Sequence, residues 1–367
     1  MRRTVCLNMI VRNEAPVIRR CLESARALID HWVIVDTGST DGTQEIVSAC
    51  LAGIPGALYA RPWRDFGHNR TEALELARGH ADYLLFVDAD ESVQVPDGFA
   101  WPDLVHDAYY LHADYAGTIY SRGALVSTRL KWWWAGVIHE YLTSAPEAKF
   151  IQLDWPRILV SHDGARARDP KTYEKDAAVL ERALAAEPQN ARYAFYLAQS
   201  YRDAGQPGKA RAAYVRRAGM AGWDEETWCA LYEVGRMGER LNAPAAEIRN
   251  AYLAAYQFRP RRAESLYQLA RFHRERQEYA LAYLFARQAI AIPRPADQLF
   301  IDDAVYRWRA LDEFSVAASW VGALAEGRQA TERLIAEGNV PAADRPRVDA
   351  NLRFYMKAAE SDASKQR

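Results

Sequence analysis

Residues 31–43 of this 367-residue chain read HWVIVDTGSTDGT, and this stretch decides how the first half of the protein folds. The apolar run 32–35 predicts a buried strand, which Asp36 closes. A Gly/Ser/Thr turn follows, and a helix is expected to begin near Thr43, with Asp41 as its cap. A carboxylate beside backbone amides and hydroxyls can meet the N–H of a base and a ribose or phosphate. The alternative interpretation is an ordinary capped strand-to-helix turn.

The same alternation of strands and helices continues on both sides of this stretch. We expect strands at residues 4–11, 31–36, 57–61 and 83–88, and helices at 15–28, 42–52 and 67–79. Strands separated by helices of this length imply parallel crossovers, so the pattern predicts an open α/β sheet with its ligand beyond the carboxyl ends of the strands. Aromatic-rich strands expected at 108–113, 125–133 and 137–143 suit an antiparallel extension.

After residues 163–170 the strand signal stops and amphipathic helices follow. Similar positions, Leu197, Val234 and Leu269, recur at spacings of 37 and 35 residues. These spacings are close to the ~34-residue period of the tetratricopeptide repeat. The sequence therefore predicts two domains and a tail, with the following bounds: an α/β domain at 1–165, an all-α tetratricopeptide-like repeat domain at 166–360, and a disordered tail at 361–367.

Composition excludes some classes of function and location. The chain has 47 Lys and Arg against 48 Asp and Glu, a net charge of −1, which argues against nucleic-acid binding. No stretch approaches the ~20 apolar residues of a transmembrane helix, which leaves peripheral membrane contact open. The 4 cysteines form no CxxC pair, so we expect a cytoplasmic location. A GxGxxG motif after the first strand is missing from the sequence, which disfavours a dinucleotide cofactor.

A second informative stretch, residues 83–91, reads YLLFVDADE. Asp88 and Asp90 follow an apolar strand and are separated by one residue. Two such carboxylates can bind one hard divalent cation, with a bound diphosphate supplying further oxygen ligands. The alternative is a pair of solvated acids on a surface loop.

Together and in this order, four segments resemble the family 2 glycosyltransferases of the GT-A fold. The segments are IVRNE at 10–14, VDTGSTDGT at 35–43, NRTEAL at 69–74 and DADE at 88–91. The resemblance covers about residues 4–162 and implies a Rossmann-like, mostly parallel sheet. With the appended repeats, the chain looks like the branch that includes bacterial peptide S-glycosyltransferases.

The resemblance also implies roles for individual residues in binding a nucleotide-sugar. Asp36 would hold the base, and Glu14 and Asp41 would shape the nucleotide pocket. Arg70 would lie near the diphosphate. A UDP-sugar is the favoured donor.

A metal site is implied by the same resemblance. Asp88 and Asp90 would form the DxD pair that binds Mn²⁺ or Mg²⁺, with Asp90 as the direct ligand and Asp88 reaching the ribose or the metal. His162, in the segment LVSHDG, resembles the family's His-x-Gly element and would be a third ligand. Whether His162 or His139 reaches the metal stays open at this point.

The catalytic base is expected in residues 132–142, WWWAGVIHEYL, which resemble a Trp-rich segment with His and Glu in this branch of the family. Glu140 would take the proton of the acceptor, and His139 would orient Glu140. The alternative is that Glu140 is salt-bridged on a strand and that the tryptophans are core residues.

The sequence thus predicts an inverting, metal-dependent glycosyltransferase that moves a sugar from a nucleotide-sugar to a protein or peptide acceptor selected by the helical repeats. In one alternative the acceptor is a lipopolysaccharide-type glycan and the repeats serve a homodimer. In another, the chain is a non-catalytic tetratricopeptide adaptor.

Overall fold

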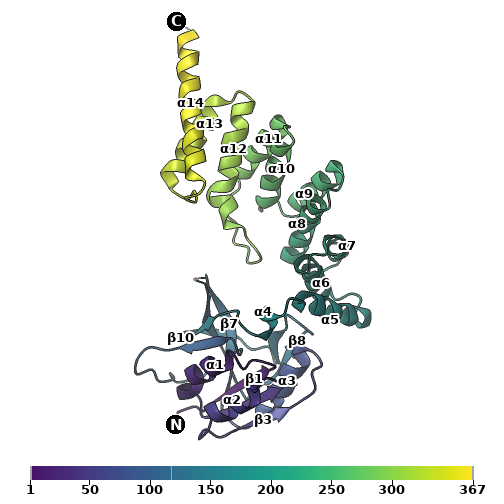
Figure 1. Ribbon diagram of the computed structural model, residues 1–367, viewed down its shortest axis with the longest axis vertical. Helices are drawn as coiled ribbons and strands as arrows, with labels where there is room; N and C mark the ends of the chain where they lie inside the picture. Colours follow the sequence, from purple (N-terminus) through teal and green to yellow (C-terminus); the bar gives the residue numbers. More distant parts are fainter. Residues whose placement is uncertain (1, 117, 366–367) are drawn as a thin grey trace. The chain divides into compact units, whose positions relative to one another are not determined.

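The computed structural model describes residues 2–116 and 118–365 of the chain. It contains two compact units, Met1–Glu187 and Pro188–Arg367. Figure 1 shows strands with flanking helices in the first unit and helices alone in the second.

Residues 166–187 belong to the first compact unit, whereas the sequence pattern ends the α/β domain at residue 165. The contacts of this segment give the reason. The backbone N–H of Ala165 donates to Glu14, and the guanidinium of Arg166 lies over the ring of Phe66, 4.9 Å from its centroid. These contacts fasten the first residues after the sheet to the sheet unit.

The first unit contains a sheet with the strand order β3-β2-β1-β4-β7-β6-β10-β5 and a separate two-stranded sheet, β8-β9. The strands are β1 (Val5–Val11), β2 (His31–Asp36), β3 (Gly56–Ala60), β4 (Tyr83–Phe86), β5 (Glu91–Gln94), β6 (Ala108–Tyr115), β7 (Thr118–Ser127), β8 (Lys131–Ala135), β9 (Tyr141–Ala145) and β10 (Phe150–Val160). The helices are α1 (Ile18–Ala25), α2 (Thr43–Cys50), α3 (Phe66–Ala77), α4 (Ala165–Arg168) and α5 (Thr172–Ala186). Strands β1 to β4 pair in parallel, and β7 joins β4 in antiparallel orientation.

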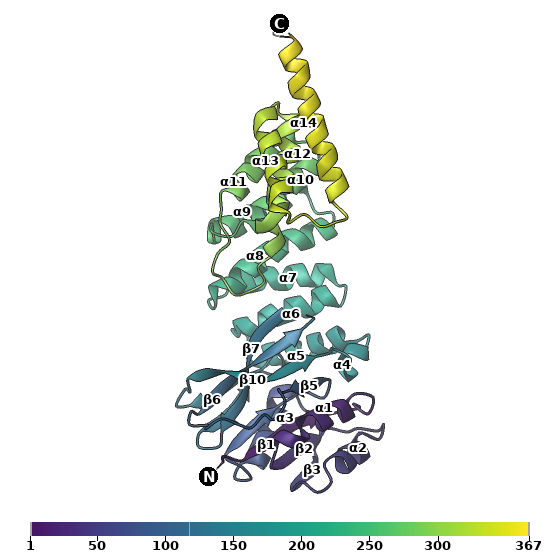
Figure 2. The ribbon, with the colours of Figure 1, turned by 90° about the vertical axis from the view of Figure 1, so that its left-hand side faces the viewer.

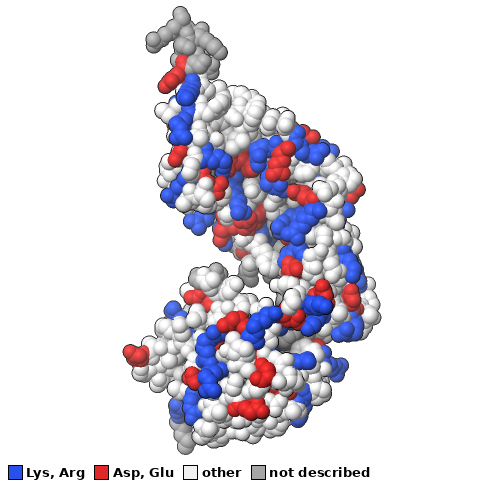
Figure 3. Space-filling model, viewed as in Figure 1, with Lys and Arg blue, Asp and Glu red and all other residues white. Residues whose placement is uncertain are grey.

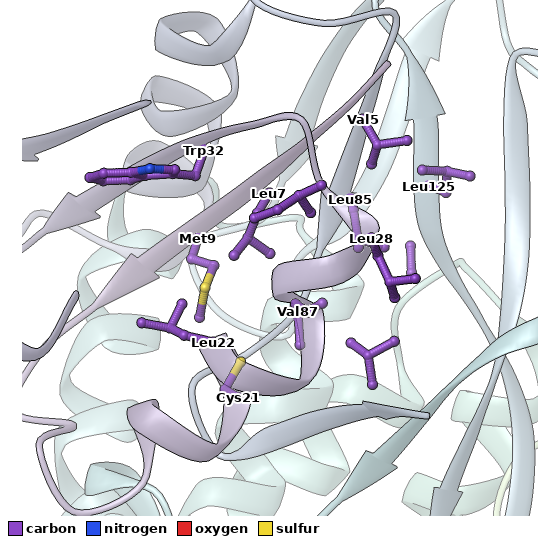
Figure 4. Close-up of a cluster of buried hydrophobic side chains, with 14 of the residues drawn as sticks. Val5, Leu7, Met9, Cys21, Leu22, Leu28, Trp32, Leu85, Val87 and Leu125 are labelled. Atoms are coloured by element: carbon purple, nitrogen blue, oxygen red, sulfur yellow. The ribbon is translucent and has the colours of Figure 1, made fainter. Parts of the chain in front are cut away.

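Strand β1 lies at the centre of the parallel region and is buried on both faces. Leu7 and Met9 point to the face covered by α1 and α2, where Leu22 packs (Figure 4). Val47 of α2 belongs to the same buried cluster. Alternate residues of β1 point to the opposite face, which α3 covers. The predicted α/β sheet is therefore confirmed, and helices cover both faces of β1, as a near-continuous apolar strand requires.

Several predicted elements beyond β4 are wrong in detail. Residues 125–133 do not form one strand, because the chain leaves β7 at Ser127 and turns before β8 begins at Lys131. Residues 137–140 form a turn rather than the start of a strand, and His139 has a φ of 51° there. The strand pattern also did not predict β5, which completes the sheet beside β10.

The second unit is built from helices that pack as successive hairpins, α6–α7, α8–α9, α10–α11 and α12–α13 (Figure 2). Their bounds are α6 (Ala191–Asp203), α7 (Pro207–Ala218), α8 (Asp224–Arg240), α9 (Ala245–Phe258), α10 (Glu264–Glu275), α11 (Tyr279–Ile290), α12 (Ala310–Trp320), α13 (Leu324–Glu337) and α14 (Arg345–Lys365), with a π-helical turn at Val305–Arg309. Leu197, Val234 and Leu269 lie in the first helix of successive hairpins, as the repeat spacing predicts.

Small residues allow the two helices of a hairpin to approach. A Cβ atom at Gly235 would lie 2.6 Å from a ring carbon of Tyr252, so only glycine fits where α8 and α9 pack together. The segment expected to be a disordered tail, 361–367, begins inside α14, which continues to Lys365. Residues 366–367 lie outside the described part of the chain.

Charged side chains of both signs are mixed over the face seen in Figure 3, in keeping with the net charge of −1. Within residues 2–116 and 118–365, no helix has the length and apolar character needed to cross a membrane.

The burial of β1 predicts the cost of shortening one of its side chains. Leu7 is completely buried, so Leu7→Ala should lower the free energy of unfolding of the first unit by about 2–5 kcal/mol. Val105, which is 57% exposed, provides the control. Val105→Ala should change the free energy of unfolding of the first unit by less than about 0.5 kcal/mol. Hydrogen exchange of the β1 and β4 amides measures both. Equal protection in the two variants would contradict the central position of β1.

Candidate active site

The predicted site residues follow strands that end at the same edge of the sheet. Val11, at the end of β1, pairs with Asp36, at the end of β2. On the other side of β1, β4 ends at Phe86, shortly before Asp88. The strand order reverses around β1, and the carboxyl edge at such a switch point is the usual ligand site of an open α/β sheet.

Asp36 has one satisfied and one unsatisfied carboxylate oxygen. Oδ1 accepts hydrogen bonds from the N–H groups of Gly38 and Ser39, both at 2.9 Å, and from Nε2 of Gln44 at 3.0 Å. Oδ2 is buried and has no hydrogen-bond partner in the described structure. Leaving a buried acceptor unpaired costs about 1–3 kcal/mol, so Oδ2 is suited to accept from a ligand N–H.

Asp41 joins the loop after β1 to the start of α2. One oxygen accepts from the hydroxyl of Thr43 at 2.6 Å, and the other accepts from the N–H of Ala15 at 3.0 Å. Slight burial raises the pKa of Asp41, but these hydrogen bonds outweigh it and hold the pKa below its usual value. Asp41 therefore stabilises the loops that surround Asp36.

Glu14 connects the loop after β1 to the start of α4. Both of its carboxylate oxygens lie within hydrogen-bond distance of the N–H of Ala165, at 3.1 and 2.9 Å. The pKa of Glu14 is raised to about 7, chiefly by burial. The hydrogen bond from Ala165 lowers this pKa in part, and the nearby carboxylate of Asp90 raises it. Glu14 is thus a shielded acid close to Asp90.

Arg70, from α3, links two of the predicted acids. Its Nη2 donates to Oδ1 of Asp88 at 2.6 Å, and its Nε lies 2.8 Å from Oε1 of Glu140. The guanidinium also lies over the ring of Trp134, 5.1 Å from the centroid. Glu140 and Arg70 are only 10% and 14% exposed, so this contact is shielded from water.

The turn that carries Glu140 lies close against α3. A Cβ atom at Gly67 would lie 2.1 Å from the carbonyl oxygen of Gly136, so the close approach requires glycine at residue 67. His139 is exposed in this turn. Trp132 is a core residue whose indole N–H donates to the carbonyl of Ser127. The tryptophans thus differ: Trp132 belongs to the core, and Trp134 contacts Arg70.

Two residues that the sequence did not single out complete the surroundings of Asp88. Arg122, from β7, has a guanidinium nitrogen 3.9 Å from Oδ2 of Asp88 and forms two hydrogen bonds to Glu91. Glu91 also accepts from the N–H of Asp88 at 2.8 Å. Burial raises the pKa of Asp88, but Arg70 and Arg122 more than offset this, and its pKa is lowered. The position of Glu91 directly after the DxD residues is the sequence feature that could have pointed to it.

Asp90 differs from Asp88, because no Lys or Arg forms a salt bridge with its carboxylate in the described part of the chain. Its Oδ2 accepts from the N–H of Gly164 at 3.3 Å. A Cβ atom at Gly164 would lie 2.9 Å from this oxygen, so glycine keeps space next to it. A hard carboxylate oxygen with space beside it suits a divalent cation that takes its other ligands from a diphosphate.

His162 is exposed, and its ring packs on Tyr115 with the centroids 4.4 Å apart. Across residues 2–116 and 118–365, no three His, Cys, Asp or Glu side chains are gathered so that they could hold a metal ion. Asp88, Asp90 and His162 are expected to bind the metal together, and the described residues contain no such ready-made group. That set stays a prediction.

Comparison with known proteins identifies the first unit. Residues 6–156 match the model of the family described as glycosyl transferase family 2. Two glycosyltransferases are similar over short segments. The SPbeta prophage-derived glycosyltransferase SunS of Bacillus subtilis is 29% identical over 87 residues, 24% of this chain and 20% of SunS. The lipopolysaccharide core biosynthesis glycosyltransferase LpsC of Rhizobium meliloti is 36% identical over 84 residues, 23% of this chain and 30% of LpsC.

A longer similarity includes the helical unit. A TPR repeat-containing protein of Synechococcus elongatus is 28% identical over 313 residues, which are 78% of this chain and 75% of that protein. Among solved structures, the crystal structure of MamA aligns with 47% of this chain and 91% of its own, at 17% identity and a TM-score of 0.38.

The raised pKa of Glu14 predicts a pH dependence of stability. Since this pKa rises from 4.5 to about 7 on folding, the stabilisation is complete below pH 4.5 and is lost as the pH rises through 7. Relative to Glu14→Gln, the wild-type free energy of unfolding should fall by about 1–3 kcal/mol between pH 4.5 and 7.5. Urea unfolding at both pH values measures this. Glu23→Gln, at an exposed ion pair, is the control, and a pH-independent difference for Glu14→Gln would contradict the assignment.

Proposed function

We propose, on the premise that residues 6–156 form a glycosyl transferase family 2 domain, that the protein transfers a sugar from a nucleotide-sugar to a protein or peptide acceptor with inversion at the anomeric carbon. The single observation that carries the proposal is the buried, unsatisfied Oδ2 of Asp36 at the sheet edge where Asp90 also lies. In this proposal a nucleotide base supplies the missing donor. Asp90, which follows β4 on the other side of β1, lies on the side of the diphosphate.

The donor is a UDP-sugar in this proposal. The imide N–H of uracil donates to Oδ2 of Asp36, while Oδ1 remains fixed by the turn amides and Gln44. The base thereby removes the cost of the unpaired oxygen. Asp41 and Glu14 hold the loops on either side of the nucleotide.

Charge balance supports a divalent cation in this site. Arg70 and Arg122 already contact Asp88, Glu91 and Glu140, so they are largely neutralised before a donor binds. Asp90 would hold Mn²⁺ or Mg²⁺ together with diphosphate oxygens, and a cation held there would supply positive charge beside the leaving diphosphate.

Glu140 is the proposed base. Its carboxylate accepts the proton of the acceptor nucleophile while that nucleophile bonds to the anomeric carbon and the bond to UDP breaks. Arg70 positions this carboxylate through its Nε, while its Nη2 contacts Asp88. His139 lies next to Glu140 in the same turn and is proposed to orient it.

Substitution of the proposed cation ligand tests the metal requirement. With purified full-length protein, UDP-sugar and Mn²⁺, Asp90→Asn should lower donor hydrolysis or transfer by at least about 100-fold, because it removes the charged ligand. Asp97→Asn, a change at an exposed loop acid, is the matched control and should keep full activity. Unchanged turnover of Asp90→Asn would remove the metal role from this residue.

The base and its positioning residue make a separate prediction. Glu140→Gln should reduce transfer by about 10²–10⁴-fold while UDP binding, measured by calorimetry, stays unchanged. Arg70→Lys should lower kcat more than it raises KM for the donor, because one ammonium cannot contact both acids as a guanidinium does. Arg78→Lys, at a surface pair with Glu75 on the same helical segment, is the control. Full activity of Glu140→Gln would contradict its role as base.

A glycan acceptor is the second candidate, and the 36% identity to LpsC over 84 residues favours it. An acceptor panel of peptides and lipopolysaccharide-type glycans separates the two. Failure to bind UDP with Mn²⁺ present would instead favour a non-catalytic adaptor.

A further inference from the structure

The connection between α11 and α12 is long and follows an extended path over residues 292–302. In Figure 2 it descends from α11 toward the level of α8 before the chain returns to α12. Its contacts reach α6, α8 and the connection between α9 and α10. A single segment of this chain therefore crosses the repeats as an extended peptide would.

The backbone of this segment is held by side chains of the repeats. Oε2 of Glu225 accepts from the N–H groups of Gln298 and Leu299, at 2.8 and 2.7 Å. Arg262 donates to the carbonyls of Leu299 and Phe300, both at 3.0 Å. Both protein side chains are buried, so these hydrogen bonds form away from water. Contacts to backbone groups recognise an extended chain rather than one particular side chain.

The acidic side chain of Asp297 forms ion pairs with three arginines. Asp297 is 3% exposed and forms two hydrogen bonds with Arg259, at 2.5 and 2.8 Å. Arg261 and Arg262 lie 3.1 and 3.5 Å from the same carboxylate. Without Asp297, these arginines would face Glu225 and Glu264 alone. The groove therefore requires an acidic residue at this position.

Apolar contacts follow the acidic position. Leu299 packs against the buried cluster that contains Phe195 and Trp228. The ring of Phe300 stacks on Phe195 with the centroids 6.5 Å apart, yet Phe300 is 60% exposed and has a φ of 47°, which is unfavourable for a residue with a side chain. The segment is thus buried and ion-paired at Asp297. At Phe300 it is exposed and its backbone is strained.

A cavity of about 410 Å³ lies next to this segment and gives the groove room for further side chains. Its lining includes Pro260, Arg261, Pro293 and Asp297. This space is open to solvent and borders the segment on the side of Pro293 and Asp297.

We propose that residues 297–300, Asp-Gln-Leu-Phe, are an internal ligand of a peptide-binding groove formed by α6, α8 and the connection between α9 and α10. A partner peptide with an acidic residue two positions before Leu and three before an aromatic residue binds there by displacing them. The inference concerns binding alone and goes beyond the transfer reaction. The groove is occupied from within until a competing peptide of this pattern replaces the segment.

The test uses full-length protein and a fluorescent synthetic peptide with the sequence of residues 293–303, PRPADQLFIDD. Asp297→Ala combined with Phe300→Ala weakens the internal segment but keeps every groove residue. Fluorescence anisotropy should show at least tenfold tighter peptide binding to this double variant than to the wild type. Asp297→Asn, a milder change, should give a smaller gain in the same direction.

Two controls make the outcome specific. Asp303→Ala removes an exposed ion pair with Arg294 in the same connection and should bind the peptide as the wild type does. A peptide with alanine in place of the aspartate that corresponds to Asp297 should lose binding to the double variant. Helix content by circular dichroism establishes that each variant is folded. Equal binding of peptide to wild type and folded variants, or binding that ignores the aspartate, overturns the proposal. Transfer activity does not enter this measurement.

Discussion

The buried guanidinium of Arg70 holds the candidate active site together. It contacts Asp88 after β4 and Glu140 before β9, and it lies over Trp134 of β8. A buried charge is tolerated only when it is paired, and removing one partner leaves the others uncompensated. Because β8 and β9 form a sheet of their own, this ion pair and the close approach at Gly67 fix the turn bearing Glu140 against the main sheet.

Much of the first unit could be predicted, because its signals are local. The apolar run that ends at Asp36 gave β2 with its observed bounds, and parallel strands bring the residues that follow them to one edge. The pairing of Arg122 with Glu91 could not be predicted in this way. It depends on the register of β7 against β4 and β6, which is set by contacts distant in the sequence.

In the helical unit, too, local features could be predicted and contacts between distant segments could not. The spacing of Leu197, Val234 and Leu269 predicted the hairpins, because each repeat packs mainly on its neighbours. The same spacing contains no sign of the segment at 292–302, whose partners Glu225 and Arg262 come from other repeats. The two units thus share one feature: buried arginine–carboxylate contacts fix segments that have no regular structure of their own.

A crystal structure of the protein with UDP and Mn²⁺ tests the central claim most directly. The account predicts the uracil base against Oδ2 of Asp36 and the cation on Asp90, with the diphosphate on the side of the sheet edge where Arg70 holds Glu140. A nucleotide bound elsewhere, with Oδ2 of Asp36 still unpaired, would contradict it.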